Sequence, residues 1–173
     1  MHTIAEEQVD MRELRTTAPD EIAGMRRTQG WVPDQYVFFS ARFSEPFADV
    51  RLLGDKQAVL TFAPDTETLT IAVGLSSVSA ANARLNSVAE VPDFDAVHAR
   101  AAALWREALG DIVVEGGSRD EMVNFYTAQY HTKLTPNLMS DVNGEYRRHD
   151  QRIARMPQGG AYYSTFSLWD TFR

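Results

Sequence analysis

Apolar and aromatic residues form short runs over the first 78 residues, and this pattern predicts strands. The run from Gln35 to Phe43 (QYVFFSARF) predicts a buried strand, and Ala58 to Phe62 and Leu69 to Leu75 predict two more around a polar turn. Residues 1–30 are polar and weakly patterned, so only short strands and turns are expected there. Gly30 to Pro33 predicts a break, because glycine permits sharp turns and proline restricts the residue before it.

From Ser79 onward the pattern favours helices. One is predicted from Ser79 to Ala89, and a second opens at Pro92 or Asp93 and ends at Gly110. The second helix has an apolar face at a spacing of about 3.6 residues, made of Phe94, Val97, Ala101, Leu104, Trp105 and Ala108. Residues 112–116 (IVVEG) predict a short strand.

A third helix is predicted to begin at Ser118, because Glu121 three residues later completes a capping box. It would stop before Pro136 and Asn137, and its apolar stripe comprises Met122, Phe125, Tyr126, Gln129 and Tyr130. The chain is therefore predicted to be α+β: a partial antiparallel β-sandwich, with too few strands to close, followed by helices.

The segment from Tyr162 to Arg173 (YYSTFSLWDTFR) carries the most informative chemistry. Trp169 and Asp170 lie beside further aromatic residues, and proteins bind sugars with a ring against the apolar sugar face and a carboxylate that accepts hydroxyl hydrogen bonds. The alternative interpretation is an amphipathic helix start, with Ser164 or Thr165 as the N-cap and the aromatic residues in the core.

Three blocks of sequence resemble the family-92 glycoside hydrolases, the calcium-dependent exo-acting α-mannosidases. STFSLWDTFR resembles a signature of that family, FYTAQYHTKLTPNLMSDVNGEYR (125–147) resembles the segment before it, and GMRRTQGWVPDQYVFFSARFSEPF (24–47) resembles part of its N-terminal β-domain. The blocks occur in the family's order, and the span from the first to the last, residues 24–173, covers most of the chain.

The resemblance implies a domain plan and marks this chain as a piece of a longer enzyme. Residues 1–78 would be the later part of the N-terminal β-sandwich, 79–117 linker helices, and 118–173 the truncated start of an (α/α)6 catalytic barrel. The missing C-terminal remainder would carry the catalytic acid, the base and the Ca²⁺ ligands. No catalytic and no metal-binding residue is therefore assigned here, and this chain alone is expected to be inactive.

The activity that the resemblance implies is removal of terminal mannose, with an α-1,2 preference, from mannans or N-glycans. The mechanism would be inverting and assisted by Ca²⁺ in the intact enzyme. Trp169 and Asp170 would bind the terminal mannose of a mannose-containing oligosaccharide, and neither would be the acid or the base. The family also implies a secreted or periplasmic location, although the charged N-terminus has no apolar segment typical of a signal peptide.

The composition excludes some classes of protein but identifies no catalytic residue. The formal charge of −7, from 24 acidic and 17 basic residues, argues against a nucleic-acid partner. The sequence has no cysteine, which excludes disulfides and thiolate chemistry. It also has no run of about 18 apolar residues, so no membrane span is predicted.

Three other polar features suggest structure more than chemistry. His131 follows the aromatic stripe, but a lone histidine near an apolar face is more often structural. Asp141, Asn143 and Glu145 alternate around a glycine as in a calcium loop, but the first ligand position and the bidentate glutamate are missing. A turn at Asn143–Gly144 is the favoured interpretation. The charged stretch around His149 and Asp150 is expected to be a solvated loop.

Two other functional classes stay open. The chain could be a non-catalytic β-domain for carbohydrate binding or assembly with appended helices, or part of another sugar-active enzyme with a helical barrel. If the chain is a piece of a longer enzyme, the apolar faces of residues 94–109 and 118–133 and the few strands around 35–75 would pack on missing parts, so exposed apolar patches are predicted on the isolated chain.

Overall fold

The computed structural model describes residues 8–30, 34–54, 56–91 and 93–165 of the 173-residue chain. The chain forms two compact units. The first comprises residues 1–92 and 139–161, and the second comprises residues 93–138 and 162–173. Each unit is therefore assembled from two separate stretches of sequence. The domain plan predicted from the resemblance, with boundaries after residues 78 and 117, describes the longer enzyme and stays a prediction.

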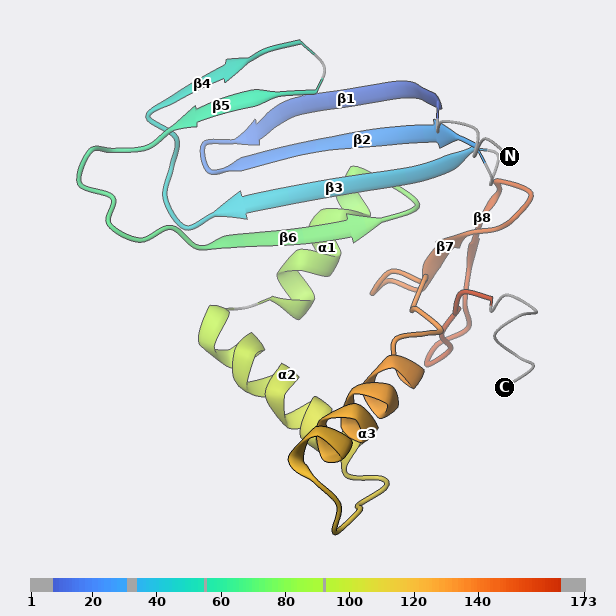
Figure 1. Ribbon diagram of the computed structural model, residues 1–173. Helices are drawn as coiled ribbons and strands as arrows, with labels where there is room; N and C mark the ends of the chain where they lie inside the picture. Colours follow the sequence, from blue (N-terminus) through green and yellow to red (C-terminus); the bar gives the residue numbers. More distant parts are fainter. Residues whose placement is uncertain (1–7, 31–33, 55, 92, 166–173) are drawn as a thin grey trace, which may run out of the picture. The chain divides into compact units, whose positions relative to one another are not determined.

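The first unit is built on a four-stranded antiparallel sheet with the order β1-β2-β3-β6 (Figure 1). Its strands are β1 (Gln8–Ala18), β2 (Glu21–Gln29), β3 (Gln35–Phe43) and β6 (Ile71–Ser76). The prediction of β3 is confirmed at both ends. The expectation of short strands within residues 1–30 is wrong, because β1 and β2 form a long hairpin, in which β1 pairs with β2 and β2 pairs with β3. Most of the break predicted at Gly30 to Pro33 lies outside the described residues.

A second, smaller ladder joins β4 (Asp49–Leu52) to β5 (Ala58–Thr61). The pattern predicted β5 but missed β4, whose sequence DVRL has no run of apolar residues. Three phenylalanine rings cluster where this hairpin meets the main sheet. The Phe43 ring lies 5.2 Å from Phe47 and 5.6 Å from Phe62, measured between centroids.

Helix α1 (Ala80–Glu90) packs against β6 and β3. Ser79 is its N-cap and accepts a hydrogen bond from the Asn82 backbone N–H. The helix approaches the sheet so closely that a Cβ atom at Gly74 would lie 1.9 Å from the Ala83 carbonyl oxygen. Ala83 itself is fully buried, and Ser40 opposite Gly74 is 1% exposed. Small side chains on both elements are thus what allows the contact.

The second unit contains α2 (Phe94–Leu109) and α3 (Arg119–Thr132). Both predicted starts are confirmed. Asp93 caps α2 through a 2.9 Å bond from the Ala96 N–H, and Ser118 and Glu121 form the capping box of α3. The strand predicted over residues 112–116 is wrong, because no neighbouring strand pairs with this segment in the described part of the chain. Residues that favour strands form one only where a neighbouring strand can pair with them.

The last ladder is the hairpin of β7 (Glu145–Arg147) and β8 (Ile153–Arg155), which returns to the first unit. The predicted turn before it is confirmed: Gly144 has φ 82°, and its N–H donates to the Asp141 carbonyl oxygen at 2.7 Å. His149 and Asp150 lie in the exposed turn at the tip of this hairpin, in agreement with the solvated loop expected there. Arg147 and Arg155, which the same expectation included, lie in β7 and β8 instead.

The predicted α+β class is confirmed by the antiparallel sheet followed by three helices. In the domain plan that the resemblance implies, α2 would be a linker helix and α3 would belong to the start of the barrel, and this plan stays a prediction. Among the helices described, none combines the length and apolar character needed to cross a bilayer.

The side of β6 opposite α1 is exposed. Gly74 and Ser76 face α1, so the alternating residues of β6 point to the other side. These are Ile71, Val73 and Leu75, with exposures of 49%, 52% and 59%. Val37 of β3 lies on the same face and is 40% exposed. A contiguous apolar face of this kind is unusual on a monomeric protein.

We predict that the purified chain binds a hydrophobic dye through this face. The variant Val73→Thr with Leu75→Thr should lose a large part of the dye fluorescence, because it replaces the centre of the apolar stripe with hydroxyls. Val113→Thr is a matched control, since Val113 is 71% exposed but lies in a loop of the other unit. A chain that binds no dye and stays monodisperse on a sizing column would contradict the prediction.

Candidate functional site

The two residues with the strongest chemical signal, Trp169 and Asp170, lie outside the described residues. The structure does describe the beginning of their segment. Leu138 and Tyr163 form an antiparallel bridge, the Ser164 N–H donates to the Asn137 carbonyl oxygen at 2.8 Å, and the Asn137 N–H donates to Ser164 Oγ at 2.9 Å. The stretch after α3 therefore anchors the start of the aromatic motif within the second unit.

Aromatic residues of the same unit join its two helices. The rings of Trp105 in α2 and Tyr130 in α3 lie 4.7 Å apart between centroids. His131 stands next to Tyr130 at 5.6 Å, on the exposed surface of the last turn of α3. The interpretation of His131 as a structural residue stays a prediction.

The densest polar cluster of the described chain surrounds Asp141 in the first unit. This carboxylate is 7% exposed and accepts three hydrogen bonds from side chains: Ser76 Oγ at 2.7 Å, Asn82 Nδ2 at 2.8 Å and Asn86 Nδ2 at 2.7 Å. Asn86 Oδ1 also accepts the Val142 N–H at 2.9 Å. We call these four side chains, Ser76, Asn82, Asn86 and Asp141, the Asp141 network.

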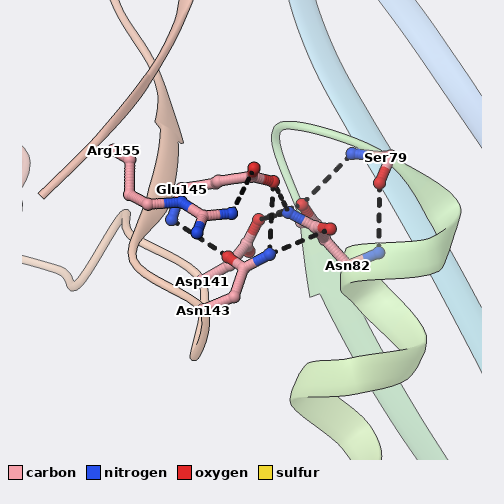
Figure 2. A network of polar contacts seen from close by, with 7 residues as sticks. Ser79, Asn82, Asp141, Asn143, Glu145 and Arg155 are labelled. Atoms are coloured by element: carbon pink, nitrogen blue, oxygen red, sulfur yellow. Dashed lines mark hydrogen bonds and ion pairs between the residues drawn. The ribbon is translucent and has the colours of Figure 1, made fainter.

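Glu145 extends the cluster toward solvent. Its Oε2 accepts from Asn82 Nδ2 at 2.9 Å and from Asn143 Nδ2 at 3.2 Å, and its Oε1 accepts from Arg155 at 2.8 Å. Figure 2 shows Asp141, Asn143 and Glu145 of the hairpin segment facing Asn82 of α1. The hydrogen bonds from Asn82 and Arg155 lower the pKa of Glu145 below its ordinary value.

Arg147 joins the hairpin to the sheet beside this cluster. Its guanidinium carbon lies 4.3 Å from the centroid of the Tyr36 ring, within the range of a cation–π contact. Its Nε donates to the Ser77 carbonyl oxygen at 2.7 Å, and Nη1 donates to that of Gln151 at 3.0 Å. The planar fork of arginine suits this combination of stacking and donation, which lysine could not reproduce.

A second buried carboxylate, Glu21, links α1 to three strands. Its Oε1 accepts from Thr17 at 3.1 Å and Ser40 at 3.0 Å, and its Oε2 accepts from Arg84 Nε at 2.9 Å. The side chain is 3% exposed. Burial raises the pKa of Glu21, but the hydrogen bonds from Arg84, Ser40 and Thr17 outweigh it, and the net pKa is lowered.

These clusters have the chemistry of structural contacts. A general acid needs a raised pKa and access to substrate, whereas Glu21 has a lowered pKa and its oxygens are occupied by donors. The oxygens of Asp141 and Glu145 are likewise occupied by amide and guanidinium donors, which would compete with a cation. Over the described ranges, no three His, Cys, Asp or Glu side chains come together to hold a metal ion.

Sequence reasoning missed the partners of Asp141. Asn82 and Asn86 are one helical turn apart on α1, where a helix packed on a sheet would ordinarily carry apolar residues. Two amide side chains on the helix face that packs against the sheet could have indicated a buried polar partner. The sequence could not identify that partner as Asp141, because Asp141 lies 55 residues after Asn86 and 59 after Asn82.

Comparisons with known proteins agree with the sequence resemblance. The model of the glycosyl hydrolase family 92 catalytic domain matches residues 82–173, which is more than half of the chain. A comparison with curated protein sequences gave no match.

Solved structures of similar fold include two mannosidases from Bacteroides thetaiotaomicron. The family GH92 α-mannosidase BT3965 is 26% identical with a TM-score of 0.84, over 96% of this chain and 25% of that one. It has also been solved in complex with mannoimidazole. The family GH92 inverting mannosidase BT2199, from strain VPI-5482, is 27% identical with a TM-score of 0.74, over 94% of this chain and 25% of that one.

The chain therefore belongs to glycosyl hydrolase family 92. It spans about a quarter of the length of the solved mannosidases that it resembles. The match to the family model starts at Asn82, so nearly all of α1 and the β7–β8 hairpin lie inside the matched region and the four-stranded sheet lies before it.

The hydrogen bonds of Glu21 with Thr17, Ser40 and Arg84 predict how the unfolding free energy depends on pH. Because the folded-state pKa of Glu21 is lowered, its contribution is complete above the unfolded-state pKa and is lost as the pH falls through the folded-state pKa. Glu21→Gln should lower the unfolding free energy at neutral pH by about 1–2 kcal/mol and flatten its decline in acid.

Chemical denaturation from pH 7 downward would measure both effects. Glu67→Gln is the control, since Glu67 is exposed in a loop. Equal acid dependence in the wild type and in Glu21→Gln would show that the folded-state carboxylate is not the source of the stability.

Proposed function

We propose that this chain forms part of an exo-acting α-mannosidase that removes terminal mannose from mannose-containing oligosaccharides. The match of more than half of the chain to the family-92 catalytic domain carries this proposal. Further support comes from the solved relatives, which are mannosidases, one of them also solved with mannoimidazole. This chain covers about a quarter of the length of those relatives, so the activity is proposed for a longer enzyme of which the chain would be a part.

Within this function, Trp169 and Asp170 would bind the terminal sugar. Tryptophan offers a flat apolar face to a pyranose ring, and an ionised aspartate strengthens the hydrogen bonds of the sugar hydroxyls. The bridge of Leu138 with Tyr163 and the paired bonds of Asn137 with Ser164 support this role, because they fix the beginning of the segment five residues before Trp169.

The finer features of the enzyme are proposals that rest on the resemblance. They are an α-1,2 preference on mannans or N-glycans, an inverting mechanism, Ca²⁺ in the intact enzyme, and a secreted or periplasmic location. The relative BT2199 is described as an inverting mannosidase, which favours the same stereochemistry here. The described residues provide no ligand set for Ca²⁺, so no step is assigned to the ion.

The alternative of a non-catalytic carbohydrate-binding or assembly domain is less well supported. A binding domain would need its own sugar site within the β unit, and the polar clusters described there are filled by internal hydrogen bonds. The family model that matches the helical part and the hairpin is that of a catalytic domain.

We predict that Asp170→Asn, made in the mannosidase that contains this sequence, reduces kcat/KM with little change in melting temperature. Asparagine keeps the shape and much of the capping ability but removes the charge. The expected loss is about 2–4 kcal/mol of transition-state stabilisation, scaled from charge-assisted hydrogen bonds. Asp65→Asn, at an exposed turn, is the control. Wild-type kinetics with a lowered melting temperature would assign Asp170 to a helix cap instead.

We also predict that the 173-residue chain alone does not hydrolyse an aryl α-mannoside, with or without added Ca²⁺. The motivating observation is that the carboxylates of the described clusters have lowered pKa values or are saturated with donors. Release of the aryl group by the purified chain would be followed by absorbance. Turnover that disappears on replacing one carboxylate of this chain would place a catalytic residue here and overturn the assignment.

A further inference from the structure

The hairpin segment, residues 141–156, has no fully buried apolar side chain, although Tyr146, Ala154 and Met156 are half-buried. Within residues 139–161, all of which the structure describes, Asp141 is the only buried residue. The apolar side chains Val142 and Ile153 are 48% and 44% exposed. Hydrophobic burial is the dominant favourable term in folding, and this segment has less of it than the main sheet, which buries Ala23, Ala41 and Phe43.

The backbone of the hairpin is also separate from the main sheet. β7 and β8 pair with each other as a two-stranded ladder, and the four-stranded sheet ends at β6. The hairpin keeps its own ladder, and in addition the Arg148 N–H donates to the Arg152 carbonyl oxygen at 3.0 Å. These bonds are internal, so the hairpin can move without breaking them.

Polar side chains make the attachment. Asp141 receives hydrogen bonds from Ser76 of β6 and from Asn82 and Asn86 of α1, and Arg147 stacks on Tyr36 and donates to the Ser77 carbonyl oxygen. Each such bond is exchanged for bonds to water on opening, so its net contribution is modest. Asp141 accepts three of these bonds at low exposure, and hydrogen bonds to a carboxylate are stronger than those between neutral groups.

The flanks of the segment can accommodate movement. On the C-terminal side, residues 157–161 are all exposed and include Gly159 at φ 79°. On the N-terminal side, Met139 is 41% exposed. Segments with few buried apolar contacts and exposed connections are those that open locally in native proteins.

We propose that residues 141–156 form a strap that opens from β6 and α1 as one unit while the four-stranded sheet stays folded, and that Asp141 is the contact that holds it closed. Opening uncovers the side chains of Ser76, Asn82 and Asn86. The strap lies inside the region matched by the catalytic-domain model, and so do its contacts on α1. The inference concerns the first unit only and does not depend on the mannosidase function.

Trypsin tests the strap in the full chain, because four arginines lie within it: Arg147, Arg148, Arg152 and Arg155. Limited proteolysis under native conditions, with mass-spectrometric mapping of the cuts, measures how often these sites become accessible. Asp141→Ala should accelerate cleavage within the strap by about tenfold or more, since cleavage of a rapidly opening segment follows the population of its open form.

Asp150→Ala is the matched control. Asp150 bonds Arg152 at 2.7 Å and pairs with Arg148, so this change alters the surroundings of two cleavage sites without touching the Asp141 network. Asn86→Ala is a milder second variant, because it removes one donor to Asp141 and the acceptor of the Val142 N–H. It should raise cleavage by less than Asp141→Ala does.

Hydrogen exchange separates opening of the strap from unfolding of the unit. In the wild type, the Val142 amide, which bonds to Asn86 of α1, should exchange faster than amides in the centre of β2 and β3, and Asp141→Ala should accelerate exchange at Val142 without accelerating it in the sheet. Two outcomes would overturn the proposal. One is a cleavage rate in Asp141→Ala no higher than in Asp150→Ala, and the other is loss of protection of the sheet in parallel with the strap.

Discussion

The close contact of α1 with β6 determines how the first unit is arranged. A helix cannot approach a sheet this closely unless the facing positions lack bulk, and here they are Gly74 on the strand and Ala83 on the helix. This contact brings Asn82 and Asn86 of the same helix beside the end of β6. The amides can then share a carboxylate with Ser76. A side chain at position 74 would displace the helix and separate the three donors to Asp141.

Charge is used in this unit to connect segments that are distant in sequence. Glu21 joins three strands to α1 through Arg84, and Asp141 joins α1 and β6 to the hairpin. Each buried carboxylate is accompanied by enough donors to offset the loss of hydration. The two clusters differ in their surroundings, because Glu21 sits within a sheet that also buries Ala23 and Ser40, while Asp141 is the sole buried residue of its segment.

The accuracy of the sequence predictions follows the range of the interactions that form each element. The starts of α2 and α3 depend on capping residues within three positions, and β3 depends on a dense run of aromatic residues, so all three could be predicted. The hairpin of β1 and β2 and that of β7 and β8 depend on pairing and side-chain contacts with distant residues, and polar sequences gave no local sign of them. Membership in the family was predictable from three blocks of sequence. The role of Trp169 and Asp170 stays a prediction, because the described residues end before them.

The distance along the sequence between the donors and the acceptor of the Asp141 network has a consequence for synthesis. Asp141 follows Ser76 by 65 positions, with both helices of the second unit between them. At a translation rate of about 5–20 residues per second, the ribosome needs roughly 3–13 seconds to cover that interval. The sheet and α1 can pair during this time while Asn82 and Asn86 remain hydrated. The first unit is thus completed only after the chain that forms α2 and α3 has been made, which orders the assembly of the two units in time.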